Sequence, residues 1–262
     1  MSGLITSPGN PLLKRIRKLR HRKHRESEGV VFVEGIAPVL QALQSGAALE
    51  MLVVAPELLT SPAAREAVAT AGVRVVEVTG DAFASIADRE HPAGLGAIVG
   101  TPVRALADVE LGGSPLVVAL DEVGNPGNLG TVVRTADAAG ADAVAVAGAS
   151  ADPGDPAAVK ASMGTVFSTP VATATLDEVL AWSRAAGLAV VATSARASVP
   201  HWEATFPERC LLLFGSEARG LPADVVDAAD LAVRIPQVGA ASSLNLAAAA
   251  AILIYEARRG RI

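Results

Sequence analysis

The sequence predicts an α/β protein made of two parts, a small mixed module followed by a larger domain built on a parallel sheet. Short apolar segments alternate with amphipathic segments along the whole chain of 262 residues, as they do in α/β proteins. Several apolar segments of the second half are uninterrupted, which is typical of strands covered on both faces of a parallel sheet. Residues 101–115, rich in proline, glycine and serine, are expected to link the two parts.

The first part, residues 1–100, is expected to be a small α/β module that begins with a basic helix. Pro62 suits the first position of a helix, because the N–H that proline lacks has no partner there in any helix. The periodicity predicts helices at residues 9–24, 36–45, 62–70 and 81–87, and strands at residues 30–33, 49–54, 73–78 and 96–99.

The second part, residues 116–262, alternates more regularly between apolar strands and helices. Strands are predicted at residues 116–120, 143–147, 188–193, 210–214 and 231–235, with an extended piece at 165–171. Helices are predicted from the loop after the first of these strands to residue 139, and at residues 156–163, 176–186 and 243–258.

Positive charge is concentrated at the start of the chain, although the net charge of the protein is −5. Residues 1–30 hold eight lysines and arginines against two glutamates, arranged around a narrow apolar stripe at helical spacing. The plainer explanation of this charge pattern is a helix face exposed to solvent. We favour an arm that binds the phosphates of an anionic polymer. The candidate RNA-binding residues are Lys14, Arg15, Lys18 and Arg22.

Composition excludes several classes of protein. The single cysteine, Cys210, rules out a disulfide within the chain and a cysteine-based zinc cluster. Aromatic residues make up 3% of the chain, which argues against a platform on which bases stack. No apolar run approaches the roughly 18 residues of a membrane span, and the N-terminus does not resemble a signal peptide. We expect a soluble, cytoplasmic protein with no metal and no membrane partner.

Three loops that follow predicted strands carry the candidate chemistry, because ligands of open α/β sheets bind at the carboxyl ends of strands. The loops, residues 121–130, 215–222 and 236–245, are rich in Gly, Pro, Asn and Ser and contain no His or Cys. A hydrolase triad or a metal site would use those two residue types. A site of backbone amides, Asn, Ser, Arg and one Glu is suited to binding a nucleoside-like ligand.

Each polar residue of these loops also has a plainer structural explanation. Asn128 can be a helix N-cap, Arg134 a surface residue with its stem on apolar neighbours, and Glu217 a solvated carboxylate in a turn. Ser242 or Ser243 can cap the last helix. The glycines of the first loop have the spacing G-x-x-G-x-x-G, and no acidic residue ends the next strand, so a dinucleotide-binding dehydrogenase is disfavoured.

Taken together, the three loops resemble the three signature motifs of the SpoU/TrmH family of RNA ribose 2′-O-methyltransferases, in the SPOUT superfamily. The first motif is matched by NPGNLGTVVRTADAAG at residues 125–140, the second by LFGSEARGLP at 213–222, and the third by IPQVGAASSLNL at 235–246. The basic segment that leads into VFVEG at residues 31–35 is similar to the small substrate-binding module often found before this domain.

The resemblance implies a deep trefoil knot in the C-terminal domain, S-adenosylmethionine as cofactor, and a homodimer whose active site takes residues from both chains. By their positions in the motifs and in the loop after residue 191, the cofactor-binding residues would be Thr193, Ser194, Gly215, Ile235 and Leu244. The catalytic residues carried over from the family are Asn128, Arg134, Glu217, Ser243 and Asn245.

In the family, the arginine at the position of Arg134 has been proposed as the base that deprotonates the ribose hydroxyl. A free guanidinium keeps its proton at neutral pH, so we favour an arginine that binds phosphate and hydroxyl together and helps the proton leave. Asn128 would orient Arg134 or the ribose, Ser243 and Asn245 would position the hydroxyl and the cofactor loops, and Glu217 would fix Arg134 or the loop geometry.

The expected substrate is ribosomal RNA, because family members that act on transfer RNA often carry terminal helical extensions in place of a separate N-terminal module. Transfer RNA and a resistance methyltransferase that protects its own ribosome are alternatives. A non-catalytic RNA-binding or ribosome-assembly protein on the same fold is a further alternative. The presence of all five catalytic residue types argues against it.

Overall fold

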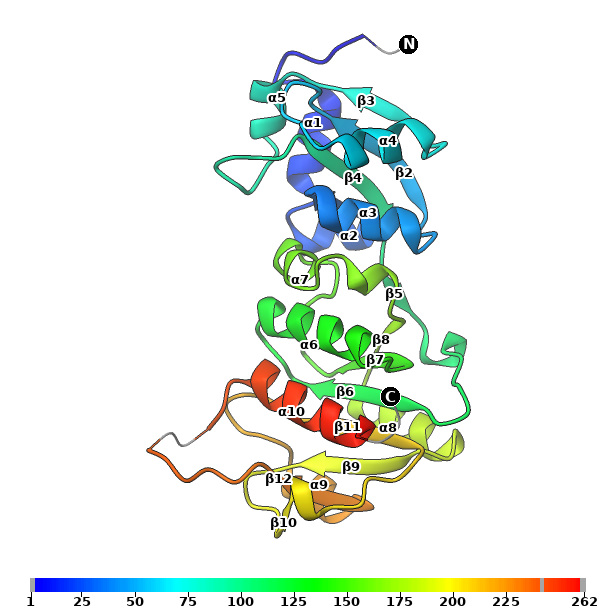
Figure 1. The fold of residues 1–262 in the computed structure, drawn as a ribbon, viewed down its shortest axis with the longest axis vertical. Coiled ribbons are helices and arrows are strands. Elements are labelled where there is room, and N and C mark those ends of the chain that lie inside the picture. Colours follow the sequence, from blue (N-terminus) through cyan, green and yellow to red (C-terminus); the bar gives the residue numbers. More distant parts are fainter. Residues whose placement is uncertain (1–2, 241–242, 260–262) are drawn as a thin grey trace. The chain divides into compact units, whose positions relative to one another are not determined.

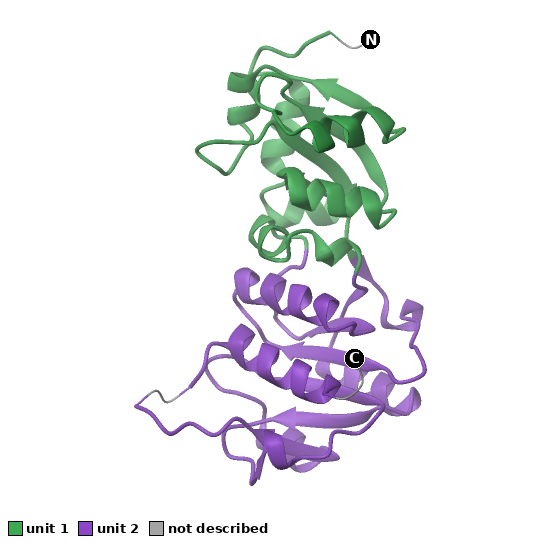
Figure 2. Ribbon diagram, viewed as in Figure 1, with its two compact units in different colours: residues 1–102, 154–168 green, residues 103–153, 169–262 purple. Residues whose placement is uncertain are grey.

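The computed structural model describes residues 3–240 and 243–259, and Figure 1 shows its fold. The chain forms two compact units, drawn in two colours in Figure 2. Unit 1 comprises Met1–Pro102 and Gly154–Ser168, and unit 2 comprises Val103–Pro153 and Thr169–Ile262. The segment 154–168 therefore belongs to unit 1, although we predicted that the second part would be continuous from residue 116 onward.

Unit 1 is built on a four-stranded mixed sheet in the order β1-β4-β2-β3. Strand β4 (Leu95–Gly100) runs antiparallel to β1 (Val30–Glu34) and to β2 (Leu49–Val54), and β2 is parallel to β3 (Val75–Glu77). The helices of this unit are α1 (Pro11–Lys18), α2 (Arg22–Glu28), α3 (Ile36–Gln44), α4 (Pro62–Thr70), α5 (Gly80–Ala84) and α7 (Pro156–Ala161), with a 3₁₀ turn, η2 (Thr165–Phe167).

The predicted basic helix over residues 9–24 is wrong, because the chain forms two short helices, α1 and α2, with a turn between them. Arg25 of α2 is buried, and its guanidinium donates hydrogen bonds to the carbonyl oxygens of Leu19 (3.0 Å) and Arg20 (2.7 Å). These contacts satisfy carbonyls at the end of α1 and fold α2 back onto it. The apolar stripe was interpreted correctly, since Leu13 and Ile16 pack in the core of unit 1.

Unit 2 is built on an eight-stranded sheet, in which every pair of neighbouring strands is parallel. Its strands, in the order of the sheet, are β10 (Val199–Pro200), β12 (Leu231–Arg234), β9 (Ala189–Thr193), β11 (Cys210–Phe214), β6 (Leu116–Asp121), β7 (Ala143–Ala147), β8 (Val171–Ala174) and β5 (Val103–Arg104). The predicted α/β class and parallel sheet are confirmed.

The central strands are buried along their whole length, as their uninterrupted apolar sequences predicted. Alternate residues of β6, β7, β9 and β11 form one cluster with apolar residues of α8 (Leu176–Ala185), α9 (Ala223–Asp227) and the 3₁₀ turn η1 (Leu106–Asp108). Helix α10 (Leu246–Arg258) packs against β11 and α6 (Pro126–Ala138), and α6 packs against β7 (Figure 1). The remaining 3₁₀ turn is η3 (His201–Glu203).

The predicted linker, residues 101–115, is partly structured. Strand β5 pairs with β8 at the edge of the large sheet, and the turn η1 follows it. The predicted extended piece at 165–171 is a 3₁₀ turn followed by the start of β8. Such two-residue strands and short turns are set by pairing with distant parts of the chain, so local periodicity did not predict them.

Candidate functional site

A pocket of about 720 Å³ opens in unit 2 at the carboxyl ends of β9, β11 and β12, next to the start of α10. Its volume lies within the range of small-molecule and cofactor sites, and its position is the one expected for ligands of parallel sheets. The structure brings all five predicted cofactor-binding residues to this pocket, together with two of the predicted catalytic residues, Glu217 and Ser243. The five are Thr193, Ser194, Gly215, Ile235 and Leu244.

Gly215 permits two backbone segments of the loop after β11 to approach each other very closely. A Cβ atom at this position would lie 2.3 Å from the backbone carbon of Gly220 and 2.3 Å from the nitrogen of Leu221. Gly220 itself has a φ of +68°, which favours glycine, and its N–H donates to the Ser216 carbonyl at 2.9 Å. The loop is therefore a tight turn whose backbone forms one wall of the pocket.

Three polar side chains from the three predicted motifs join in one chain of hydrogen bonds. The amide nitrogen of Asn128 donates to Oε1 of Glu217 at 2.8 Å. The amide nitrogen of Asn245 donates to Oδ1 of Asn128 at 3.1 Å. Asn128 is thus the central member of the network, and it links the loop after β11 to the start of α10.

The helix caps leave these amides free to interact with one another. Asn125, not Asn128, is the N-cap of α6, and its Oδ1 accepts hydrogen bonds from the N–H groups of Gly127 and Asn128. Asn245 caps α10 with its Oδ1, while its Nδ2 reaches Asn128. The alternative in which Ser243 caps this helix is wrong, because the helix starts three residues later than predicted. Ser242 lies outside the described residues.

Three of the predicted catalytic residues, Asn128, Arg134 and Asn245, do not line the pocket, and Arg134 is the one of the three that the hydrogen-bond network does not include. It lies on α6 two turns beyond the start of the helix, and its side chain is exposed. Within the described ranges 3–240 and 243–259, no hydrogen bond or ion pair holds this guanidinium, and the pocket lining does not contain it. Arg134 is therefore available to a group outside its own chain.

A charged pair beside the pocket was not predicted from the sequence. Arg219, which lines the pocket, forms an ion pair with Glu122 in the loop after β6. Glu122 has a φ of +51°, an uncommon conformation for a residue with a side chain. Burial raises the pKa of the neighbouring Asp121 above its ordinary value, and the charge of Glu122 raises it further. Both members of the pair lie in the loops singled out earlier, which is the only signal that the sequence offered.

Comparison with known proteins matches residues 115–255 to the family model described as the SpoU rRNA methylase family. This chain belongs to that family. The match spans the whole parallel sheet except β5, and it contains all three motifs. The family recognised from the three loops is therefore confirmed.

Relatives of this SpoU methylase align over nearly its whole length. A 23S rRNA (guanosine(2553)-2′-O)-methyltransferase of Bacillus subtilis is 32% identical and covers 97% of this chain and 98% of its own. A 23S rRNA (uridine(2479)-2′-O)-methyltransferase of Streptomyces viridochromogenes is 34% identical over 93% of this chain and 88% of its own. The crystal structure of an AdoMet-bound rRNA methyltransferase of Sinorhizobium meliloti has a TM-score of 0.89, with 37% identity over 99% of this chain and 98% of that chain.

Residues 10–97 match a second family model, the MRM3-like substrate binding domain. Two of the predicted RNA-binding residues, Lys14 and Lys18, lie one turn apart on the exposed face of α1. Arg15 is instead bound to Glu28 (2.6 Å) and Glu50 (2.6 Å), and these hydrogen bonds hold the pKa of the guanidinium well above its ordinary value. Arg22 pairs with Glu26 one helical turn away. Two of the four predicted RNA-binding residues therefore have acidic partners within unit 1.

Two kinds of feature are absent from the described part of the chain. No helix there is both long and apolar enough to cross a membrane. No cluster of three or more His, Cys, Asp or Glu side chains is placed there to hold a metal ion.

Proposed function

We propose that this SpoU methylase transfers a methyl group from S-adenosylmethionine to a ribose 2′-hydroxyl of ribosomal RNA. The observation that carries the proposal is the network Glu217–Asn128–Asn245, which joins all three motifs beside a pocket of cofactor size. The names of the relatives support the reaction and the substrate class. The AdoMet-bound structural neighbour supports the cofactor.

The residues of the pocket fit the proposed cofactor. About 720 Å³ is enough for a nucleoside with an amino-acid tail, and the missing side chain at Gly215 lets the loop after β11 close into the tight turn whose backbone lines the pocket. Thr193, Ser194, Ile235 and Leu244 would hold it from the other loops. When bound, S-adenosylmethionine supplies a methyl group on a positively charged sulfur, which is already activated for transfer to oxygen.

The protein then has to align the hydroxyl and let its proton leave. Alignment of two reactants can lower a barrier by roughly 7–11 kcal/mol, so side chains that position the ribose hydroxyl can supply a large part of the catalysis. We assign to Arg134 the binding of the RNA phosphate and ribose hydroxyl. Glu217 fixes the loops through Asn128, and Ser243 and Asn245 position the hydroxyl and the third motif.

The proposal includes a homodimer, because Arg134 is exposed on α6 and does not line its own pocket. Ile252 and Tyr255 on the adjacent helix α10 are also exposed, as apolar side chains of an interface would be in one isolated protomer. A trefoil knot is part of the proposal too. It is supported by the position of β11, which lies between β6 and β9 in the sheet although it follows both of them in the sequence. The proposed location is the cytoplasm.

The first test is methyl transfer from labelled S-adenosylmethionine to separate pools of unmodified ribosomal RNA and transfer RNA. We expect a labelled 2′-O-methylnucleoside from ribosomal RNA alone. Label in transfer RNA alone would overturn the substrate class, and binding of both ligands with no label in either pool would overturn the reaction. Arg134→Ala should abolish transfer while it retains cofactor affinity. An equal loss of cofactor affinity would assign Arg134 a structural role.

Co-expression of two inactive variants tests the shared site. Arg134→Ala and Ser243→Ala, carried on differently tagged chains, would form heterodimers in which one of the two sites has both native residues. Purified heterodimers should regain about half of the wild-type activity per dimer if the two residues act across the interface. No recovery would place both residues of each site on one chain.

A further inference from the structure

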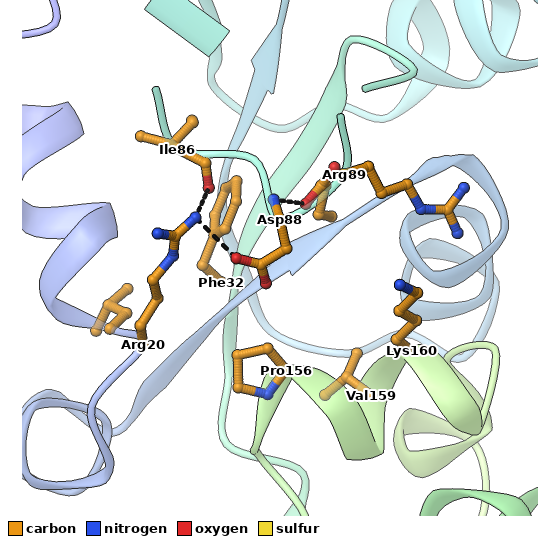
Figure 3. Close-up of a pocket in the computed structure, with 10 residues that line it drawn as sticks. Arg20, Phe32, Ile86, Asp88, Arg89, Pro156, Val159 and Lys160 are labelled. Atoms are coloured by element: carbon orange, nitrogen blue, oxygen red, sulfur yellow. Dashed lines mark hydrogen bonds and ion pairs between the residues drawn. The ribbon is translucent and has the colours of Figure 1, made fainter. Parts of the chain in front are cut away.

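A second pocket lies within unit 1, where the loop between α5 and β4 meets β1 and α7 (Figure 3). Its enclosed space is about 30 Å³, which is the room of roughly one water molecule. A nucleotide base is several times larger and does not fit inside. Any recognition by this pocket therefore takes place at its rim.

The loop that forms one side of the pocket is held in place by two side chains. Arg20 donates hydrogen bonds to the carbonyl oxygens of Ile86 (3.2 Å) and Ala87 (2.8 Å), and it forms an ion pair with Asp88 at 2.7 Å. Glu34, the last residue of β1, accepts a hydrogen bond from the N–H of Asp88 at 2.7 Å. Figure 3 shows the ion pair between Arg20 and Asp88. The next residue, Arg89, is thus presented from an anchored loop.

Arg89 and Lys160 are the two exposed cations at this rim that the described structure leaves without an acidic partner. In Figure 3 the charged ends of both side chains lie on the same side of the pocket. Neither of the two acids of the lining forms an ion pair with Arg89 or Lys160. Asp88 is neutralised by Arg20, and Glu34 directs one carboxylate oxygen to the loop backbone while its other oxygen is buried.

We propose that Arg89 and Lys160 bind a phosphodiester group of the RNA substrate at the rim of this pocket. The inference rests on the proposed function, since it assumes that the macromolecule bound by unit 1 is RNA. The guanidinium can contact two phosphate oxygens at once, and the ammonium adds a compact charge. The predicted RNA-binding residues all lie on α1 and α2, whereas this site uses the α5–β4 loop and α7.

Lys160 is informative because it lies far outside residues 10–97, the part of the chain that matches the substrate-binding family model. It belongs to unit 1 only because the segment Gly154–Ser168 packs there. Helix α7 contacts β1, and a Cβ on Gly164 would lie 2.8 Å from the backbone of Pro38 in α3, so the segment is closely fitted. The surface that contacts RNA would therefore include a residue contributed by the second half of the sequence.

The test compares the double variant Arg89→Gln/Lys160→Gln with the matched control Arg74→Gln/Arg184→Gln. Both pairs are exposed and remove the same charge, but the control residues lie outside the pocket. Binding of a ribosomal RNA fragment is measured against salt concentration, without methyl transfer. Loss of two phosphate contacts should reduce the slope of log K against log salt by about 1.4 for single-stranded RNA, and the control should keep the wild-type slope.

Steady-state methyl transfer gives a second readout. We expect the double variant to raise KM for RNA at least about tenfold with kcat within about twofold, because a contact made equally in the ground and transition states affects binding alone. Arg89→Lys/Lys160→Arg should restore the slope. An unchanged slope, or an equal loss in the control pair, would overturn the phosphate site. If the wild-type protein transfers no methyl group, the proposed function is overturned. This inference still stands if the double variant lowers the salt slope of RNA binding relative to that wild-type protein.

Discussion

Replacement of Asn128 by aspartate should break the hydrogen-bond network at its centre. The change replaces the amide nitrogen that lies 2.8 Å from Oε1 of Glu217 with a carboxylate oxygen, so a hydrogen bond becomes a contact between two negative charges. At this separation the Coulomb repulsion is about 1.5 kcal/mol in water and about 6 kcal/mol at an effective dielectric constant of 20. Asn128 is half-buried and Glu217 is exposed, so we expect a value near the lower limit.

This repulsion would push the loop that carries Gly215 and Glu217 away from α6 and distort the pocket. A cost of about 1.4 kcal/mol corresponds to a tenfold loss of affinity. We therefore expect Asn128→Asp to bind S-adenosylmethionine about tenfold more weakly at pH 8, measured by isothermal titration calorimetry. Two neighbouring carboxylates raise the pKa of one of them, so the pair should take up a proton as the pH falls toward 5 and the affinity should recover.

The double variant Asn128→Asp/Glu217→Gln provides the control. The amide of glutamine can donate to the new aspartate, so the hydrogen bond is restored with donor and acceptor exchanged. Its affinity should return to within about threefold of the wild-type value at pH 8. The reasoning would be refuted by Asn128→Asp binding the cofactor normally, or by a double variant no better than the single one.

Three further outcomes are expected. Gly215→Ala should weaken cofactor binding at least about tenfold in calorimetry, because its Cβ would overlap the backbone at residue 220, whereas Gly124→Ala, whose Cβ meets open space, should bind normally. The hydrogen bond from Arg15 holds the pKa of Glu50 below its ordinary value. The pair therefore stabilises unit 1 fully at pH values above the ordinary pKa of glutamate, and this stabilisation is lost as the pH falls through the lowered pKa. Urea unfolding should show Glu50→Gln to be less stable by up to about 1 kcal/mol at pH 7 and equal to wild type near pH 2, and equal curves at both pH values would contradict this. Lys14→Gln/Lys18→Gln should lower the salt slope of RNA binding by about 1.4, while an unchanged slope would remove α1 from the RNA surface.

The parts of the fold that local sequence determines were predicted well. The strands at 49–54, 143–147 and 210–214 have the predicted bounds. The last two are uninterrupted apolar runs, and the first is apolar except for Glu50. Strands β5 and β10 were missed, since each has only two residues and exists through pairing with a distant strand. The turn after α1 was missed for a different reason: the guanidinium of Arg25 donates a hydrogen bond to the carbonyl oxygen of Leu19, and apolar periodicity does not show such a contact of a charged side chain with the backbone.

The candidate site was predicted only in part. The motifs identified the residues of the pocket, but Asn128 and Glu217 are separated by 89 positions, and no local pattern shows that they form a hydrogen bond. The pair Glu122–Arg219 depends on how two loops fold. The motifs predicted residues that line the pocket, and the three-dimensional arrangement showed which polar side chains form hydrogen bonds with one another.

The placement of the segment 154–168 has a consequence for how such a protein can be divided or recombined. The backbone passes between the units after residues 102, 153 and 168, so neither unit is a continuous piece of the gene. A fragment ending at residue 102 would lack α7 and leave uncovered the part of β1 that this helix contacts. Exchange of the N-terminal module between relatives would therefore have to carry a second, internal segment with it, and a simple fusion at residue 102 would separate parts that fold together.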